Sequence, residues 1–191
     1  MKLSDILAGD RVTVSCELFP PKTGAALEKV EDVLRDTAAL RPDFISVTYG
    51  AGGSTSKRTL ELASRLQDVY HVPALAHLTC VSSTREEVAA QAARLRAAGL
   101  ENILALRGDV PQDASFPSPA QFRYASELVS YLRGLPGGGD LCIGGACYPE
   151  GHVECPHFSE DLDNLKRKVD AGLDFLTTQM FFDNDVLYRF L

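Results

Sequence analysis

Glu17 is the first residue of the chain whose type and surroundings suit chemistry. It lies in CELFPP (16–21), where apolar neighbours flank the carboxylate near the end of an apolar run. Partial removal from water favours the protonated form of a carboxyl group, so Glu17 is a candidate proton donor. Pairing with an Arg or a Lys at a strand end is the alternative, and the residues alone leave both open.

Arg107, Gly108 and Asp109 form a second polar motif, directly after an apolar run. Glycine permits the backbone to pass close to a flat ligand. Arg107 can pair with a phosphate, and Asp109 can accept a hydrogen bond from a heterocycle N–H. The alternative is a turn that is held by an Arg107–Asp109 pair.

A third group of polar residues recurs at steps of three or four along one helical segment: Asp161, Asn164, Arg167 and Lys168. Residues at this spacing share one face of a helix. The acid and the amide could bind the hydroxyls of a ribose, and the two cations could bind a diphosphate. A solvated, charged helix face is the alternative.

Three isolated polar residues complete the candidates. His77 and His152 are each a possible ligand-binding residue, base or hydrogen-bonded core residue. Gln179 lies in a run that otherwise predicts a buried strand, where a side-chain amide needs hydrogen-bonding partners such as a heterocycle.

The elements that would position these residues alternate along the chain. Amphipathic patterns predict helices over 26–39, 55–70, 84–98, 121–133 and 160–171, and a last helix that begins near Asn184. Ser83 and Glu86 predict a capping box for the third of these helices. Short apolar runs predict strands between the helices, which implies parallel strands with right-handed crossovers. These runs are VTVSCELF (12–19), FISVTYG (44–50), ALAHLTC (74–80), NILALRG (102–108), LCIGGACYP (141–149) and FLTTQMFF (175–182).

The fold class follows from where the polar residues lie. Each predicted strand carries polar residues at its carboxyl end, which is typical of a barrel mouth, whereas an open sheet gathers them at one switch point. No G-x-G-x-x-G motif follows the first strand. We predict an α/β fold, a (β/α)8 TIM barrel of which the single domain 1–191 covers about six βα units, since a complete barrel needs about 250 residues.

Composition narrows the possible functions. The net charge of −7 argues against a sequence-independent nucleic-acid binder. The absence of a secretion signal or of an apolar run of about 20 residues predicts a cytoplasmic protein without a membrane span. Five cysteines, an odd number, argue against a disulfide framework. A zinc site near Cys142, Cys147 and Cys155 would lack the usual paired spacing, so we expect no metal.

The motifs, taken in order, resemble the methylenetetrahydrofolate reductase family, from about Val14 to the last residue. That resemblance implies a (β/α)8 barrel that holds FAD at its carboxyl-terminal mouth. It also implies that NADH or NADPH reduces the FAD, which then passes hydride to methylenetetrahydrofolate to give 5-methyltetrahydrofolate, in one-carbon and methionine metabolism. The matching segments are SCELFPPK (15–22), VTYGAGGS (47–54), HLTC (77–80), LRGD (106–109), FRYASELV (122–129), ACYPEGH (146–152), NLKRKVDAG (164–172) and TQMFFD (178–183).

The resemblance also implies residue roles. Glu17 matches the general acid that helps to open the methylene bridge, Asp109 a carboxylate near the flavin and the pterin, and Gln179 an amide that contacts folate and nicotinamide. Glu17 and Asp109 are thus the expected catalytic residues, and both bind substrate together with Gln179. The expected FAD-binding positions are Thr48, Tyr49, Ala51, His77, Arg107, Gly108, Asp109, Tyr124, Ala125, Tyr148, His152, Asp161, Asn164, Arg167 and Lys168.

The family barrel continues past the sixth strand, whereas this sequence stops at Leu191. We therefore expect either a fragment or a chain that a homo-oligomer or a partner subunit completes. A non-catalytic module with partial FAD binding is the alternative function. A Schiff-base aldolase is disfavoured because no lysine stands at a predicted strand end. The choice among NADH, NADPH and a ferredoxin-linked partner stays open.

Overall fold

The strands of this protein form one parallel sheet in a computed structural model, which describes residues 1–21, 29–49, 56–81, 83–110, 117, 118 and 120–191. The order within the six-stranded sheet is β1-β2-β3-β4-β5-β6, which is also the order along the chain. The strands are β1 (Ser15–Leu18), β2 (Phe44–Val47), β3 (Ala74–Thr79), β4 (Asn102–Leu106), β5 (Cys142–Cys147) and β6 (Phe175–Thr178).

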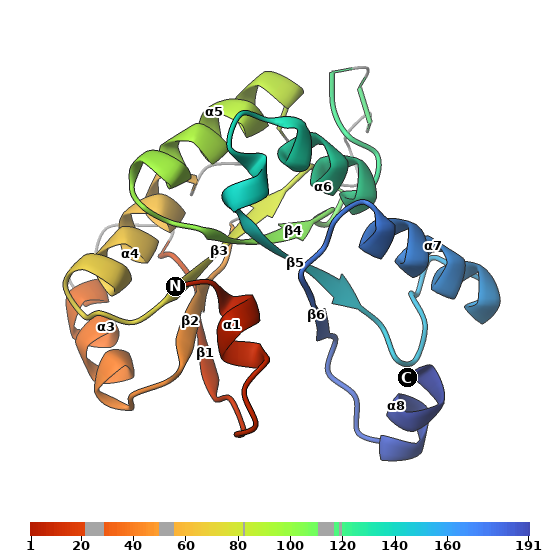
Figure 1. The fold of residues 1–191 in the computed structure, drawn as a ribbon, viewed down its shortest axis with the longest axis horizontal. Helices are drawn as coiled ribbons and strands as arrows, with labels where there is room; N and C mark the ends of the chain where they lie inside the picture. Colours follow the sequence, from red (N-terminus) through yellow and green to blue (C-terminus); the bar gives the residue numbers. More distant parts are fainter. Residues whose placement is uncertain (22–28, 50–55, 82, 111–116, 119) are drawn as a thin grey trace.

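A helix follows each strand, and the sheet curls around its concave side (Figure 1). The fold is therefore an incomplete (β/α)8 barrel of six βα units, as predicted. The strands β1 and β6 are its two edges. The helices are α1 (Leu3–Leu7), α3 (Val30–Ala39), α4 (Ser56–Asp68), α5 (Arg85–Ala97), α6 (Ala125–Gly134), α7 (Phe158–Asp170) and α8 (Asn184–Phe190), with a 3-10 helix η2 (Gly138–Asp140).

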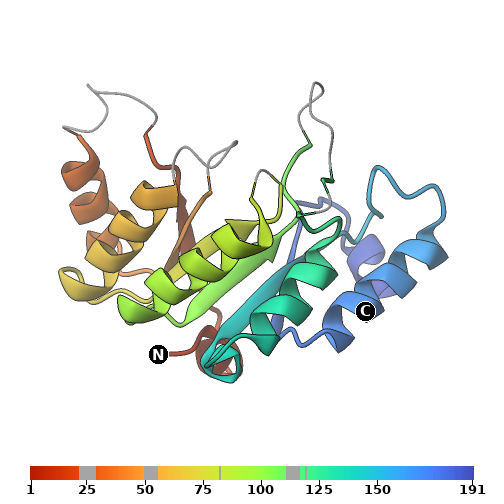
Figure 2. The ribbon, with the colours of Figure 1, turned by 90° about the horizontal axis from the view of Figure 1, so that it is seen from above.

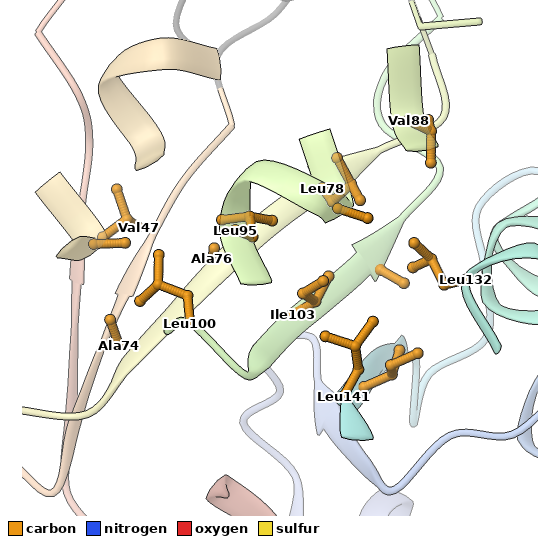
Figure 3. Close-up of a cluster of buried hydrophobic side chains, with 14 of the residues drawn as sticks. Val47, Ala74, Ala76, Leu78, Val88, Leu95, Leu100, Ile103, Leu132 and Leu141 are labelled. Atoms are coloured by element: carbon orange, nitrogen blue, oxygen red, sulfur yellow. The ribbon is translucent and has the colours of Figure 1, made fainter. Parts of the chain in front are cut away.

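The main core lies between the convex face of the sheet and the surrounding helices. Because side chains alternate along a strand, every second residue points outward, and these residues are apolar. Val47, Ala76 and Ile103 have no exposed surface, and they pack with residues such as Leu95 of α5 and Leu132 of α6 (Figure 3). This layer fixes the strand ends from which the polar residues project.

The concave face holds a smaller apolar cluster at the end where the strands begin. Leu75, Leu104 and Cys142 pack there against Leu3 of the short helix α1, which was not predicted (Figure 2). The side chain of Asn102 ties this helix down, since its Oδ1 accepts a hydrogen bond of 2.8 Å from the Leu3 amide. The helix α1 thus closes this end of the barrel and leaves the opposite end for a site.

Several boundaries differ from the predicted ones. The N-cap of α5 is Thr84, which forms a capping box with Glu87, one residue later than predicted. The helix α6 begins at Ala125 rather than at 121, because 120–124 form a turn and bends. The predicted start of α3 at 26 lies outside the described residues. All strands are shorter than predicted, and Arg107 and Tyr148 lie in the loops that follow β4 and β5.

Candidate functional site

A cavity of about 930 Å³ opens where the strands end. The carboxyl ends of β3, β4 and β5 line it, together with the start of α6 and most of the length of α7. This is the end of a barrel at which active sites are built. Many of the expected FAD-binding residues line it: Tyr49, Arg107, Gly108, Asp109, Tyr124, Ala125, Tyr148, His152, Asp161, Asn164, Arg167 and Lys168.

The remaining expected FAD-binding residues lie elsewhere. His77 lines a smaller cavity of about 240 Å³, which shares Tyr49 with the large one. Thr48 lines neither cavity, and its carbonyl oxygen accepts a hydrogen bond of 2.9 Å from Thr59 Oγ1. Ala51 lies outside the described residues. The structure therefore gathers the residues from β4, β5 and α7 more closely than those from β2 and β3.

Arg107 forms a bidentate ion pair with Glu154 at one wall of the cavity. Its Nη1 and Nη2 donate hydrogen bonds of 2.6 and 2.7 Å to the two carboxylate oxygens of Glu154. The alternative Arg107–Asp109 pair is therefore wrong, and Asp109 is exposed. Gly108 has φ +84°, and a Cβ there would lie 3.2 Å from Thr79 Cβ. Glycine is thus needed for this turn.

The four polar residues of α7 line the cavity as one face, but they differ in their partners. Asp161 Oδ2 accepts a hydrogen bond of 3.0 Å from the amide of His152. Lys168 Nζ donates to the carbonyl oxygen of Ala146, at the end of β5. Burial lowers the pKa of Lys168. Asn164 and Arg167 are exposed, so they are free to meet a ligand in the cavity.

Two flat side chains stand on the loop that joins β5 to α7. The rings of Tyr148 and His152 meet edge to face, with 4.7 Å between their centroids. Gly151 has φ +87°, which lets the chain turn between them. Nδ1 of His152 accepts a hydrogen bond of 3.1 Å from the Glu154 amide, so the proton of a neutral ring lies on Nε2. The loop therefore presents ordered aromatic surfaces to the cavity.

The candidate acid lies on the concave face, next to two polar residues of neighbouring strands. Ser46 Oγ donates a hydrogen bond of 3.1 Å to Glu17 Oε2, and His77 Nε2 lies 3.5 Å from the same oxygen. Glu17 and Ser46 are register partners in the β1–β2 pair. The carboxylate is therefore held by strand geometry. Its side chain is 46% exposed, so the expected apolar surroundings are only partly present at this edge strand.

Sequence reasoning missed Ser46, although a signal was present. In FISVTYG (44–50) the residues Ile45 and Val47 point into the outer core, which places Ser46 on the concave face. His77 is 9% exposed, and burial lowers its pKa, an effect that Glu17 opposes. His77 is thus neutral at pH 7. Its Nε2 is buried without a hydrogen-bond partner among the described residues.

Gln179 is not buried, contrary to the expectation for its strand. The strand β6 ends at Thr178, and Gln179 is exposed just beyond it. Its backbone amide donates a hydrogen bond of 2.8 Å to the carbonyl oxygen of Cys147. The physical reason is that β6 is an edge strand that pairs only with β5 in the described part of the chain.

The cysteines and the overall surface add no further chemistry to this site. All five cysteines are free. Burial raises the pKa of Cys80 to about 12, which makes it a poor nucleophile. No cluster of three or more His, Cys, Asp or Glu in the described ranges could hold a metal ion. Within the same ranges, no helix has the length and apolar character that a membrane crossing requires.

Comparison with known proteins agrees with the motifs. Residues 2–191 match the methylenetetrahydrofolate reductase family. Methylenetetrahydrofolate reductase 1 of Schizosaccharomyces pombe is 40% identical over 191 residues, which cover 97% of this chain and 32% of the yeast protein. The 5,10-methylenetetrahydrofolate reductase of Escherichia coli is 38% identical over 180 residues, which cover 94% of this chain and 58% of that protein. The chain thus spans a third to somewhat over half of these relatives.

Solved structures share the fold at low sequence identity. Oxaloacetate acetylhydrolase superposes with a TM-score of 0.65 and 12% identity, over 99% of this chain and 66% of that chain. An uncharacterized Clostridium thermocellum protein that binds two copies of 5-methyl-5,6,7,8-tetrahydrofolic acid gives 0.61 and 13%, over 98% and 61%. At such identities the likeness concerns the barrel fold alone.

Proposed function

The chain belongs to the methylenetetrahydrofolate reductase family, and from this we propose that it reduces 5,10-methylenetetrahydrofolate to 5-methyltetrahydrofolate, with FAD in the large cavity and NADH or NADPH as hydride donor. A rice relative, 36% identical, is named as a probable NADH enzyme, which favours NADH. The observation that carries the proposal is the cavity itself. It brings together residues from three strand ends and two helices that the motifs assign to FAD.

The residues present fit a flavin dinucleotide. A cavity of about 930 Å³ is at the upper end of the range for ligand pockets, about 300–1,000 Å³. Arg167 and Lys168 supply positive charge for a diphosphate, while Asp161 and Asn164 supply acceptors and an amide for hydroxyl groups. The buried Nε2 of His77, beside Glu17 on the concave face, offers a further polar contact.

The protein's own residues would supply the acid catalysis. A bound flavin would provide two-electron hydride chemistry. Glu17 would donate a proton to the folate nitrogen that leaves as the methylene bridge opens. Ser46 Oγ donates a hydrogen bond to Oε2 of that carboxyl group, so Oε1 would be the oxygen that carries the proton. His77 Nε2 lies 3.5 Å from Oε2, and burial lowers the pKa of His77.

The other carboxylate and the amide would bind the substrate. Asp109 is exposed at the cavity wall, where it can accept hydrogen bonds from the N–H groups of the pterin. Gln179 directly follows β6, at the edge of the sheet where the carboxyl ends of the strands lie. Its side-chain amide is exposed and would bind the folate or the nicotinamide, although Oε1 accepts a 3.2 Å hydrogen bond from the Met180 amide in the structure.

The cationic face of α7 gives a direct test of cofactor binding. Changing Arg167 and Lys168 together to Ala should strip FAD from the purified protein during desalting, measured by visible absorbance. Hydrogen bonds to charged groups contribute about 1.5–3 kcal/mol each, so the loss of two should weaken binding by about 100-fold or more. Lys166→Ala is the control, since Lys166 pairs with Asp170 on the same helix outside the cavity. Unchanged flavin content in the double variant would remove this face from the site.

A further inference from the structure

We propose that Glu154 is a positioning residue that holds Arg107 and fastens the β5–α7 loop across one wall of the large cavity. The Arg107–Glu154 pair would thereby set how fast a bound cofactor leaves. The inference rests on the proposed function for the identity of the ligand, but its structural part concerns the protein alone. None of the eight family motifs includes Glu154, which lies two residues beyond the nearest one.

The geometry of the pair supports a fastening role. Arg107 follows the end of β4, and Glu154 lies 47 residues later in the loop between β5 and α7. Both residues line the cavity. The Arg107 side chain is 24% exposed and the Glu154 side chain 58%, and two parallel hydrogen bonds join the guanidinium to the carboxylate. A bidentate Arg–carboxylate pair fixes the relative orientation of the two side chains as well as their distance, whereas a single hydrogen bond fixes only the distance.

Other hydrogen bonds already hold the part of the β5–α7 loop that leads into α7. The Arg107–Glu154 pair therefore fixes only the position of the residues around Glu154. The amide of His152 is held by Asp161, and Nδ1 of His152 accepts from the amide of Glu154. The Cys155 amide donates a 2.9 Å hydrogen bond to the His152 carbonyl oxygen. These contacts persist when the Glu154 side chain is changed. Loss of the ion pair should therefore separate the residues around Glu154 from the end of β4 without unfolding the loop.

Arg107 consequently acts through its position more than through its charge. The charge is neutralised by Glu154, whereas the exposed Arg167 on α7 has no such partner among the described residues. A ligand between β4 and the loop is enclosed on this side while the pair is intact. Parting the two side chains opens that wall, which should speed the departure of the ligand.

The test compares FAD release from the wild-type protein, Glu154→Gln, Glu154→Asp and Glu150→Gln, each loaded with FAD and diluted, with flavin fluorescence as the signal. Exposed ion pairs are weak, and the Glu154 side chain is 58% exposed, so we expect an increase of a few-fold, about fivefold at most, for Glu154→Gln. Glu154→Asp keeps the charge and should restore part of the wild-type rate. Glu150→Gln removes a carboxylate from the same loop outside the cavity and should leave the rate unchanged.

A second measurement needs no cofactor. Amide hydrogen exchange over 149–157 in the ligand-free protein should be faster in Glu154→Gln than in the wild type. If the wild type retains FAD, and Glu154→Gln releases it no faster or leaves loop exchange unchanged, the inference is overturned while the proposed function stands. A wild-type protein that retains no FAD would overturn the proposed function, and the role in cofactor release with it.

Discussion

Replacing Glu17 with Gln is expected to slow the reduction of methylenetetrahydrofolate by about 10²–10⁴-fold, the usual contribution of general acid catalysis. The leaving nitrogen would lose its proton donor, since a side-chain amide cannot supply a proton at neutral pH. Reduction of the flavin by a nicotinamide needs no proton on the folate, so that half-reaction should keep its rate. Stopped-flow absorbance, with each half-reaction measured separately, provides the comparison.

Ser46→Ala is the matched variant for this experiment. It keeps the carboxyl group of Glu17 and removes the 3.1 Å hydrogen bond that orients it. A single hydrogen bond contributes about 0.5–1.5 kcal/mol, so the folate half-reaction should slow by about tenfold at most. If Glu17→Gln slows both half-reactions equally, Glu17 is not the acid of the folate step.

Arg133→Met is expected to cost about 2–4 kcal/mol of unfolding free energy, because one side chain has four hydrogen-bonding partners at the end where the strands begin. Its guanidinium donates to the carbonyl oxygens of Gly172, Gly138 and Leu141 at 2.8, 3.0 and 2.7 Å. It also pairs with Asp174 at 2.5 Å, which in turn accepts from the Ile143 amide. Urea unfolding with an unchanged m-value would measure the loss.

Arg35→Met is the control for this variant. Arg35 makes ion pairs with Asp32 and Asp36, and its side chain is 60% exposed. Exposed pairs contribute at most about 1 kcal/mol, so this change should be nearly neutral. Arg133→Lys keeps the charge but loses the forked geometry, and it should lie between the wild type and Arg133→Met. Equal losses for Arg133→Met and Arg35→Met would show that Arg133 is an ordinary surface residue.

The barrel was predictable because short apolar runs alternate with amphipathic helical segments along the chain. The face of α7 was predictable for the same kind of reason, since Asp161, Asn164 and Lys168 lie within two turns of one helix. Positions within single elements follow from local periodicity.

Contacts between elements were not predictable to the same degree. Arg107 pairs with Glu154, which lies 47 residues later in the chain. The two residues meet because the end of β4 lies next to the β5–α7 loop. From the sequence, only the nearby Asp109 could be suggested as a partner, and that alternative is wrong. The environment of Gln179 depends on its edge strand, for which the run 175–182 gives no sign. The helix α1 went unpredicted because its five residues are too short for a periodic pattern.

The most direct test of the proposed reductase activity is the visible absorption spectrum of the purified protein through one anaerobic cycle. We expect the bands of bound flavin, their bleaching by NADH or NADPH, and their return on addition of methylenetetrahydrofolate, with 5-methyltetrahydrofolate formed in equal amount. A protein without flavin bands, or one whose bleached bands fail to return when methylenetetrahydrofolate is added, would contradict the proposal.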